Sequence, residues 1–203
     1  MWSDPVSSVG RLIIISGPSG AGKSTVVRRL MQACPLPIEL SVSVTTRAAR
    51  QGEEDGRDYH FVSKERFQEL RAQGAFLECK EVFGRGDWYG TLRQTVDNGL
   101  SEGKWVLLEI DVQGAICVME QCPNALSFFV HPGSLDELEA RLRRRATDSE
   151  EAILRRLQVA ADELQAVSHY RYKIINREVE HSVQEICRLL QNHNEEGSNA
   201  RST

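Results

Sequence analysis

Long hydrophobic runs are missing from this sequence, and so is any segment typical of a membrane or secreted protein. Its apolar stretches are short and interrupted, so none reaches the roughly 20 residues that a membrane-spanning helix needs. The first ten residues, MWSDPVSSVG, carry neither the basic nor the apolar region of a secretory signal. We therefore expect a cytoplasmic protein that does not bind membranes.

Cysteine pairs with the spacing of a metal or redox site are also absent. The five cysteines form no C-x-x-C pair and no cluster with the scattered histidines. We expect reduced thiols, as in most intracellular proteins, and we assign no cysteine as a nucleophile.

A strong charge of either sign is lacking as well. The 203 residues carry a formal net charge of -4, with 27% charged and 40% hydrophobic residues. This balance gives no general reason to bind nucleic acid, so any anion site must be local. The length suits one globular unit with inserted subdomains, and no internal repeat or low-complexity tract interrupts it.

The most informative stretch joins a short apolar run to a glycine-rich turn. The run 12–15 is typical of a buried strand, and the turn GPSGAGKS fits G-x-x-x-x-G-K-[ST] at every specified position. Glycines leave backbone N–H groups free to face an anion, Lys23 can reach the outer phosphates of a nucleotide, and the Ser24 hydroxyl can bind Mg²⁺. An ordinary glycine turn is the alternative, but the order strand, loop, helix favours a nucleotide site. The candidate phosphate-binding residues are Gly17, Pro18, Ser19, Gly20, Ala21, Gly22, Lys23, Ser24 and Thr25.

Strand and helix patterns alternate along most of the chain, which predicts a three-layer α/β fold around a parallel sheet. Ligands then bind beyond the carboxyl ends of the strands, where the phosphate loop, Glu109, Asp111 and Asn176 fall. S/T-x-x-E capping boxes at Ser134, Thr147 and Ser182 predict three helix starts. The predicted strands are 12–15, 38–44, 105–110, 125–130 and 172–175, the other predicted core helix is 24–33, and residues 1–9 and 191–203 are expected to be flexible.

Residues 43–92 differ in kind from the rest of the chain. The stretch 45–58 is polar and holds three arginines, and a solvated loop is an equal alternative on composition alone. Short strands are predicted over 59–62 and 75–83, a helix over 64–73, and a glycine-rich turn over 84–91. Several short strands around one helix predict a small mixed α/β lobe inserted into the core.

This lobe holds side chains that suit a nucleoside monophosphate. Two arginines, Arg47 and Arg50, with two tyrosines can hold one phosphate monoester. A buried carboxylate can recognise guanine, because the N1–H and the N2 amino group are donors that suit two acceptor oxygens, whereas adenine presents no such pair. The candidate residues are Ser43, Arg47, Arg50, Tyr59, Glu78, Tyr89 and Thr91.

An arginine-rich helical segment, 134–157, is the candidate lid. Its six arginines are balanced by six acidic residues, so a solvated helix pair is the alternative. Its position directly after a predicted strand favours arginines that close over phosphates, which guanidinium groups bind bidentately without losing their charge.

Together these motifs resemble the guanylate kinase family over about residues 10–190. The matching stretches are ISGPSGAGKST, SVSVTTRAAR, G-x-D-Y-x-F, FLE, WYGT, LEIDVQG and RLRRRATDSEE. The resemblance implies Mg²⁺-dependent transfer of the ATP γ-phosphate to GMP and dGMP within purine metabolism, by a monomer or homodimer. It also implies a P-loop core of residues 10–42, 93–133 and 158–190, a GMP-binding lobe of residues 43–92 and a lid of residues 134–157.

The resemblance further implies a role for each matching residue. Ser43 and Glu78 would contact guanine, and Arg47, Arg50, Tyr59 and Tyr89 would hold the GMP phosphate. Thr91, Glu109 and Asp111 would line the same substrate pocket. The lid arginines would be Arg141, Arg145 and Arg156, and Asn176 would lie near the ATP base.

Three departures from the family pattern affect the loops and remove no charged group. Ala49 stands where proline is frequent, Ala146 where the lid has glycine, and the turn before Trp88 is about two residues longer. Two other functions stay open on the same scaffold: a guanylate-kinase-like module that binds phosphopeptides, and a kinase for another phosphorylated acceptor such as a ribose bisphosphate.

Overall fold

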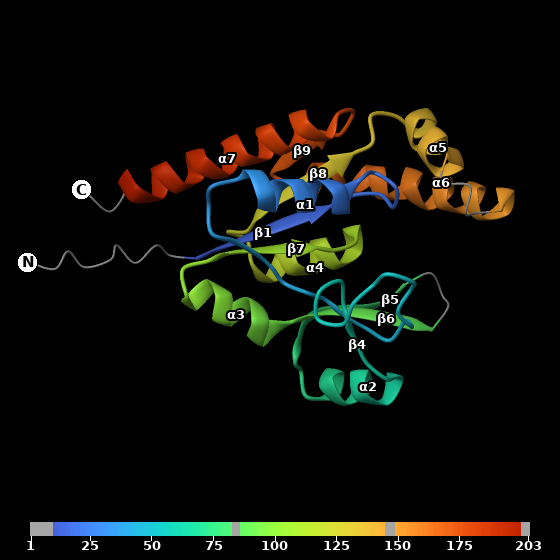
Figure 1. Ribbon diagram of the computed structural model, residues 1–203, viewed down its shortest axis with the longest axis horizontal. Helices are drawn as coiled ribbons and strands as arrows, with labels where there is room; N and C mark the ends of the chain where they lie inside the picture. The colour runs from blue at the N-terminus through green and yellow to red at the C-terminus, as the bar shows by residue number, and fades with distance from the viewer. Residues whose placement is uncertain (1–9, 83–85, 145–148, 200–203) are drawn as a thin grey trace, which may run out of the picture. The chain divides into compact units, whose positions relative to one another are not determined.

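The computed structural model describes residues 10–82, 86–144 and 149–199 as an α/β fold with two sheets (Figure 1). The strands of the larger sheet are β1 (Arg11–Ser16), β2 (Ile38–Leu40), β7 (Trp105–Glu109), β8 (Leu126–His131) and β9 (Tyr172–Ile175). They lie in the order β2-β7-β1-β8-β9, and β2 with β7 and β8 with β9 form parallel pairs. This arrangement confirms the predicted parallel sheet.

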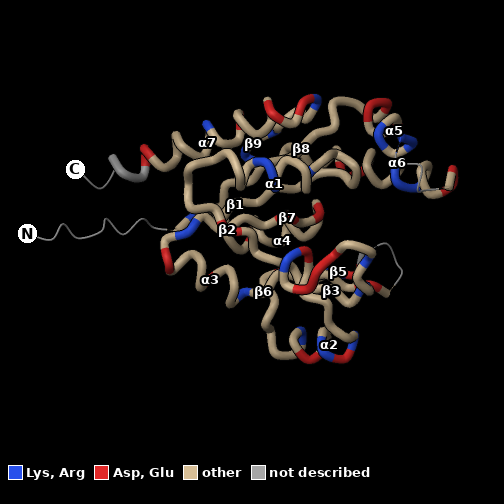
Figure 2. The backbone as a smooth tube through the Cα atoms, viewed as in Figure 1, with Lys and Arg blue, Asp and Glu red and all other residues tan. Residues whose placement is uncertain are grey.

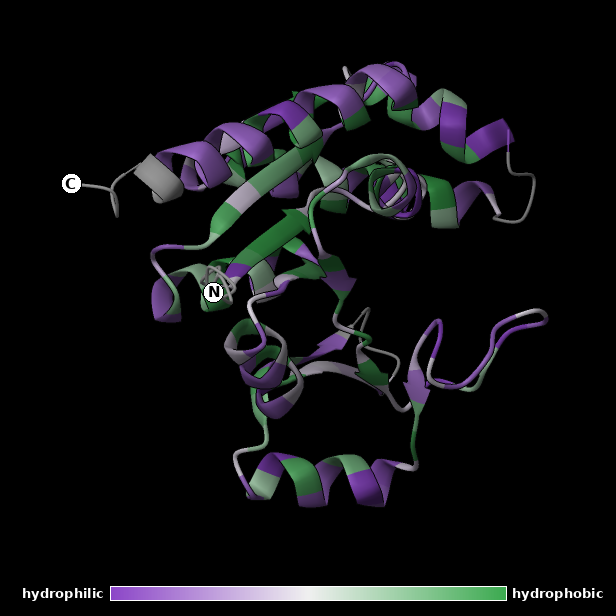
Figure 3. Cartoon of the chain, turned by 60° about the vertical axis from the view of Figure 1, so that its left-hand side comes forward, coloured by the Kyte–Doolittle hydropathy of each residue, from purple (hydrophilic) through white to green (hydrophobic). Residues whose placement is uncertain are grey.

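Burial explains why these short segments form strands. Ile13, Ile14 and Ile15 of β1 are completely buried, as are Leu107 of β7 and Phe128 of β8. Continuous apolar runs of this kind suit parallel strands covered on both faces. Figure 3 shows these strands mostly in the hydrophobic colour, whereas the helices carry many hydrophilic residues.

The smaller sheet consists of β3 (Val44–Thr45), β4 (His60–Phe61), β5 (Phe76–Val82) and β6 (Asp87–Leu92). Its order is β4-β3-β6-β5, and β6 pairs antiparallel with both β3 and β5. Helix α2 (Lys64–Ala72) packs on it through Phe67, whose ring stacks on Phe76 with 4.5 Å between centroids. Ser63 caps this helix, and Gly74 follows its end with a φ of 67°.

The other helices belong to the core and to the candidate lid. Helices α1 and α7 lie side by side in Figure 1. Helices α5 and α6 pack through a buried cluster of Leu138, Leu142, Ile153 and Ala160. Among the described residues, no helix is both long and apolar enough to span a bilayer. The bounds are α1 (Lys23–Ala33), α3 (Arg93–Ser101), α4 (Val112–Gln121), α5 (Leu135–Arg144), α6 (Glu150–Leu164), a 3₁₀ helix (Gln165–His169) and α7 (Val179–Asn199).

The chain divides into two compact units, each of which brings together separate stretches of sequence. The first comprises Met1–Ile13, Pro37–Leu108 and Ile116–Ala125, and it includes the smaller sheet. The second comprises Ile14–Leu36, Glu109–Ala115 and Leu126–Thr203, and it includes the phosphate loop, α5, α6 and α7. The finer boundaries of core, lobe and lid stay predictions.

Three predictions about the elements are wrong. The segment 38–44 is not one strand, because β2 belongs to the larger sheet and β3 to the smaller one. Residues 87–91 form strand β6 and not a turn, since they pair with β5. Residues 191–199 continue α7 and are not a disordered tail.

The capping boxes have mixed outcomes. The Ser134 hydroxyl accepts a hydrogen bond from the backbone N–H of Glu137, as predicted. Thr147 lies outside the described residues, and Ser149 is the residue that caps α6. The box at Ser182 is wrong, because α7 already begins at Val179 and Ser182 is buried inside it.

Candidate active site

The phosphate loop links β1 to α1 and has the backbone shape that its glycines allow. Gly22 is the residue before α1, with a φ of 95°, and a Cβ there would lie 2.5 Å from the side-chain nitrogen of Asn176. Only glycine fits such a position without strain. The loop therefore ends at the N-terminus of α1, where free N–H groups and the helix dipole favour an anion.

Lys23 folds back over the loop. Its ammonium donates hydrogen bonds to the carbonyls of Gly17 (2.7 Å) and Pro18 (3.1 Å). Burial lowers the pKa of Lys23 below its ordinary value of 10.5, although the nearby carboxylates of Glu109, Glu163 and Asp111 oppose this shift. The ammonium is thus held over the loop by groups that an incoming phosphate can replace.

The side-chain oxygens of Ser24 and Glu109 lie together at the end of the same loop. The Ser24 hydroxyl donates a 2.5 Å hydrogen bond to Glu109 Oε1, which joins α1 to the end of β7. Asp111 Oδ1 instead accepts from the N–H of Gly114 at the start of α4 (2.8 Å). The described residues contain no cluster of three or more His, Cys, Asp or Glu that could enclose a metal. A hydroxyl beside one carboxylate fits Mg²⁺, which takes few protein ligands and completes its shell with phosphate and water.

Asn176, directly after β9, is 2% exposed and faces the loop. Its side-chain nitrogen donates to the carbonyl of Ala21 (2.8 Å), and its side-chain oxygen accepts from the Ser182 hydroxyl (3.1 Å). Arg141 reinforces the link, because its guanidinium donates to the carbonyls of Ala21 (3.2 Å) and Asn176 (2.5 Å). This network fixes the loop to α5 and to the start of α7.

A second arginine of the candidate lid also reaches the loop. Arg156 donates to the Ser19 hydroxyl at 2.9 Å. Arg143, in contrast, pairs with Glu139 and Glu150 on the exposed side, and Figure 2 shows charges of both signs along α5 and α6. Arg145 and Ala146 lie outside the described residues. Two of the three predicted lid arginines thus contact the phosphate loop.

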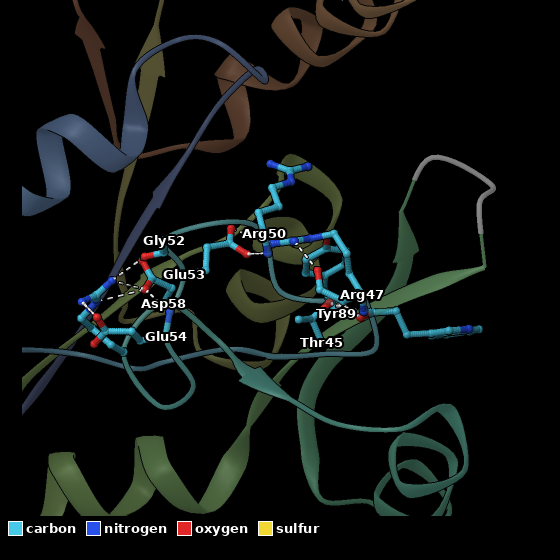
Figure 4. Close-up of polar contacts among 11 residues, drawn as sticks. Thr45, Arg47, Arg50, Gly52, Glu53, Glu54, Asp58 and Tyr89 are labelled. Carbon is cyan, nitrogen blue, oxygen red and sulfur yellow. Dashed lines mark hydrogen bonds and ion pairs between the residues drawn. The ribbon is translucent and has the colours of Figure 1, made fainter. Parts of the chain in front are cut away.

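In the first unit, the lobe of residues 43–92 builds a separate cationic site around Arg47 (Figure 4). The Arg47 Nε donates to the Tyr89 hydroxyl (3.0 Å), and its guanidinium carbon lies 5.4 Å from the ring centre of Tyr59 and 5.9 Å from that of Phe61. Burial alone would lower the pKa of Arg47, but hydrogen bonds to Glu53 and Tyr89 raise it. The guanidinium is therefore permanently charged and enclosed by aromatic rings.

Glu78 and Thr91, two further candidate substrate residues, lie on neighbouring strands of the smaller sheet. Glu78 on β5 stands opposite Thr91 on β6, and the buried Thr91 hydroxyl donates to Glu78 Oε1 at 2.7 Å. Tyr89 and Thr91 are two residues apart on β6, so they share one face of the sheet. The Arg50 side chain is exposed and extends away from Glu53 in Figure 4, and Ser43 pairs through its carbonyl with the N–H of His60.

Two residues in these sites were not predicted from the sequence. Glu53 bonds to the Arg47 guanidinium and to the N–H of Arg50. Its proximity in sequence to both arginines was a usable signal. Ser182 was interpreted as a helix cap, and nothing in the sequence indicated its bond to Asn176.

Similarity to known proteins agrees with this arrangement. The guanylate kinase family model matches residues 9–193. The chain is 54% identical over 190 residues to a guanylate kinase of Rhodopirellula baltica, covering 93% of this chain and 90% of that one. It is 48% identical over 179 residues to a guanylate kinase of Trichormus variabilis, covering 88% of each. The crystal structure of guanylate kinase from Anaplasma phagocytophilum matches with a TM-score of 0.75 at 38% identity, covering 92% of this chain and 87% of that one. A complete phosphate loop, a separate cationic lobe and these matches lead to one conclusion: the chain belongs to the guanylate kinase family.

Proposed function

We propose that this protein transfers the γ-phosphate of ATP to GMP, and likewise to dGMP, giving the diphosphate and ADP. The observation that carries the proposal is a pair of groups bound to strand β6: the Arg47 guanidinium, hydrogen-bonded to Tyr89, and the Glu78 carboxylate, oriented by Thr91. The first suits a phosphate monoester and the second suits the donor edge of guanine. The relatives named guanylate kinase support the same substrate.

The acceptor in this reaction is an anionic phosphate oxygen, so no general base is needed. Catalysis then consists of positioning and charge neutralisation. Lys23 and the N–H groups of the loop would bind the outer phosphates of ATP, and Arg47 and Arg50 would offset the repulsion between two anionic substrates. Arg141, Arg145 and Arg156 would meet charge on the transferred group, and closure of the lid would exclude water.

Ser24 would hold Mg²⁺ together with the nucleotide phosphates, with Glu109 accepting from its hydroxyl or from a water ligand. A magnesium ion held there would supply positive charge that neutralises the nucleotide phosphates. Asn176 would lie near the ATP base. Ser43 would contact guanine. Asp111, which accepts a hydrogen bond from the N–H of Gly114 in α4, would line the substrate pocket.

The decisive experiment measures the steady-state rate of ADP formation from ATP and Mg²⁺ with each of a panel of acceptors. The panel contains GMP, dGMP, AMP, CMP, UMP and a ribose bisphosphate. We expect turnover with GMP and dGMP and little with the others. Turnover with the ribose bisphosphate alone would support the second kinase hypothesis. Binding of a phosphopeptide without any ADP formation would support a scaffold.

The proposed reaction needs no nucleic acid and no membrane, and a monomer or homodimer in the cytoplasm can carry it out.

A further inference from the structure

The carboxylate of Glu53 links the two arginines of the 47–53 loop. Glu53 Oε1 accepts a 2.9 Å hydrogen bond from Arg47 Nη2, and Oε2 accepts a 2.8 Å bond from the backbone N–H of Arg50. The N–H of Glu53 in turn donates to the carbonyl of Arg50 at 3.0 Å. Glu53 therefore binds the side chain of one proposed phosphate ligand and the backbone of the other (Figure 4).

This ion pair differs from the other ion pairs among the described residues of the lobe, because it is better shielded from water. The side chains of Arg47 and Glu53 are 13% and 19% exposed, whereas those of Arg66 and Glu69 are 54% and 60% exposed. Exposed pairs contribute little because water and salt screen them, and shielded pairs lose less. The hydrogen bond from Arg47 also lowers the pKa of Glu53, so the carboxylate stays charged at neutral pH.

The contacts of Arg47 leave capacity for a ligand. A guanidinium has five N–H groups. In the described part of the chain, three of them donate hydrogen bonds: one to Tyr89, one to the carbonyl of Ala48 and one to Glu53. Two N–H groups suffice for a bidentate phosphate contact. Glu53 thus orients the guanidinium without using all of its donors.

We propose that Glu53 is a positioning residue for the acceptor phosphate: it holds Arg47 and the 47–53 loop in the binding conformation before the substrate arrives. The inference rests on the proposed function, in which Arg47 binds the GMP phosphate. Glu53 itself does not touch the substrate. Preorganisation of this kind strengthens binding by removing the cost of ordering a long side chain and a loop.

Charge repulsion and positioning predict opposite changes in GMP affinity when Glu53 loses its charge, so the proposal is testable. A carboxylate near the phosphate site repels the phosphate, so its neutralisation alone would tighten GMP binding. Loss of positioning weakens GMP binding instead. Glu53→Gln separates the two, because glutamine has nearly the same shape and its amide oxygen can still accept from the N–H of Arg50.

The experiment measures equilibrium dissociation constants of GMP and of guanosine by calorimetry for the wild type, Glu53→Gln and Glu69→Gln. Glu69→Gln is the matched control, because Glu69 also pairs with an arginine of the lobe but on exposed α2. We expect Glu53→Gln to weaken GMP binding about tenfold or more, with guanosine affinity, the KM for ATP and the melting temperature unchanged. Glu69→Gln should match the wild type in all four.

Guanosine is the probe that excludes a general structural effect, because it has the base but no phosphate. An equal loss of GMP and guanosine affinity in Glu53→Gln would overturn the proposal, and so would unchanged or tighter GMP binding. Failure of the proposed function gives a different result, since the wild type would then not phosphorylate GMP at all. If the wild type phosphorylates GMP and Glu53→Gln binds GMP with unchanged affinity, the positioning role is rejected and the proposed function is not.

Discussion

The side-chain nitrogen of Asn176 donates a 2.8 Å hydrogen bond to the carbonyl of Ala21, which fixes the residue after β9 to the phosphate loop. The orientation of this amide depends on Ser182, whose hydroxyl donates to the Asn176 side-chain oxygen. Both residues are buried, so water cannot replace either bond without a rearrangement. The shape of the loop therefore depends on a serine in α7.

Ser182→Ala tests this dependence. The substitution leaves the Asn176 oxygen buried without its donor, which should cost roughly 1–3 kcal/mol in the free energy of unfolding. We also expect a higher KM for ATP, because the amide is then free to rotate away from Ala21. Urea unfolding and steady-state kinetics measure the two effects. The control is Ser101→Ala, since the Ser101 hydroxyl donates to a carbonyl at the exposed end of α3. Equal stability of the two variants would contradict the prediction.

Lys23→Met should abolish most of the activity and leave the fold intact. Methionine keeps the length and the apolar part of the side chain but loses the charge that stabilises the phosphates. We expect kcat to fall on the order of 100- to 1,000-fold, with an unchanged circular dichroism spectrum. Lys104→Met is the matched control, because Lys104 forms exposed ion pairs with Glu39 and Glu102. Near-normal turnover of Lys23→Met would refute the assignment of the loop.

The lowered pKa of Lys23 predicts an early loss of ATP affinity as the pH rises. The charged ammonium is the form that binds phosphate, and it loses its proton as the pH passes through its pKa. Because burial lowers this pKa, the loss should begin at a lower pH than for an ordinary lysine of pKa 10.5. ATP affinity measured without an acceptor avoids ionisation of the guanine base.

Lys23→Arg is the control for this pH dependence. A guanidinium keeps its charge across the whole range, so the weaker affinity of this variant should stay constant with pH. A wild-type affinity that stays constant up to pH 10.5, with the protein still folded by circular dichroism, would contradict the lowered pKa.

The elements that could be predicted from the sequence are those with a distinct local pattern, such as a continuous apolar run or a glycine motif. The run 12–15, the glycine motif and α1 follow each other so closely that hydrophobicity and backbone freedom predict all three. The strands β7 and β8 also follow from their apolar runs, because a strand that is buried on both faces can be recognised from its own residues.

Features that depend on distant parts of the chain could not be predicted in this way. No helix was expected over α3 or α4, whose glycines and β-branched residues are weak helix formers. Packing compensates there: Gly99 of α3 lies so close to Val106 of β7 that an added Cβ would be 2.6 Å from it. Alternation over 38–44 predicts one strand and does not show that two sheets share the segment. The sequence also showed the charges of 45–58 without showing that Glu53 pairs with Arg47.

Glu78→Gln should reduce the preference for GMP over AMP. Thr91 donates to Glu78 Oε1, which orients the carboxylate. A glutamine keeps one acceptor for guanine, but its NH₂ group would oppose the other guanine donor or the Thr91 hydroxyl. Losing one hydrogen bond to a charged group and creating this mismatch should lower kcat/KM for GMP roughly tenfold to a hundredfold. The low kcat/KM for AMP should not fall, because adenine presents no matching pair of donors.

Glu81→Gln is the control for this substitution, three residues further along β5. Glu81 accepts from the N–H of Gly86, and its odd spacing from Glu78 places it on the opposite face of the strand. It should keep the wild-type ratio of GMP to AMP turnover, measured by ADP formation from each acceptor at fixed ATP. If Glu78→Gln also kept that ratio, guanine would have to be recognised elsewhere, and Arg47 alone would not explain how this chain selects a purine.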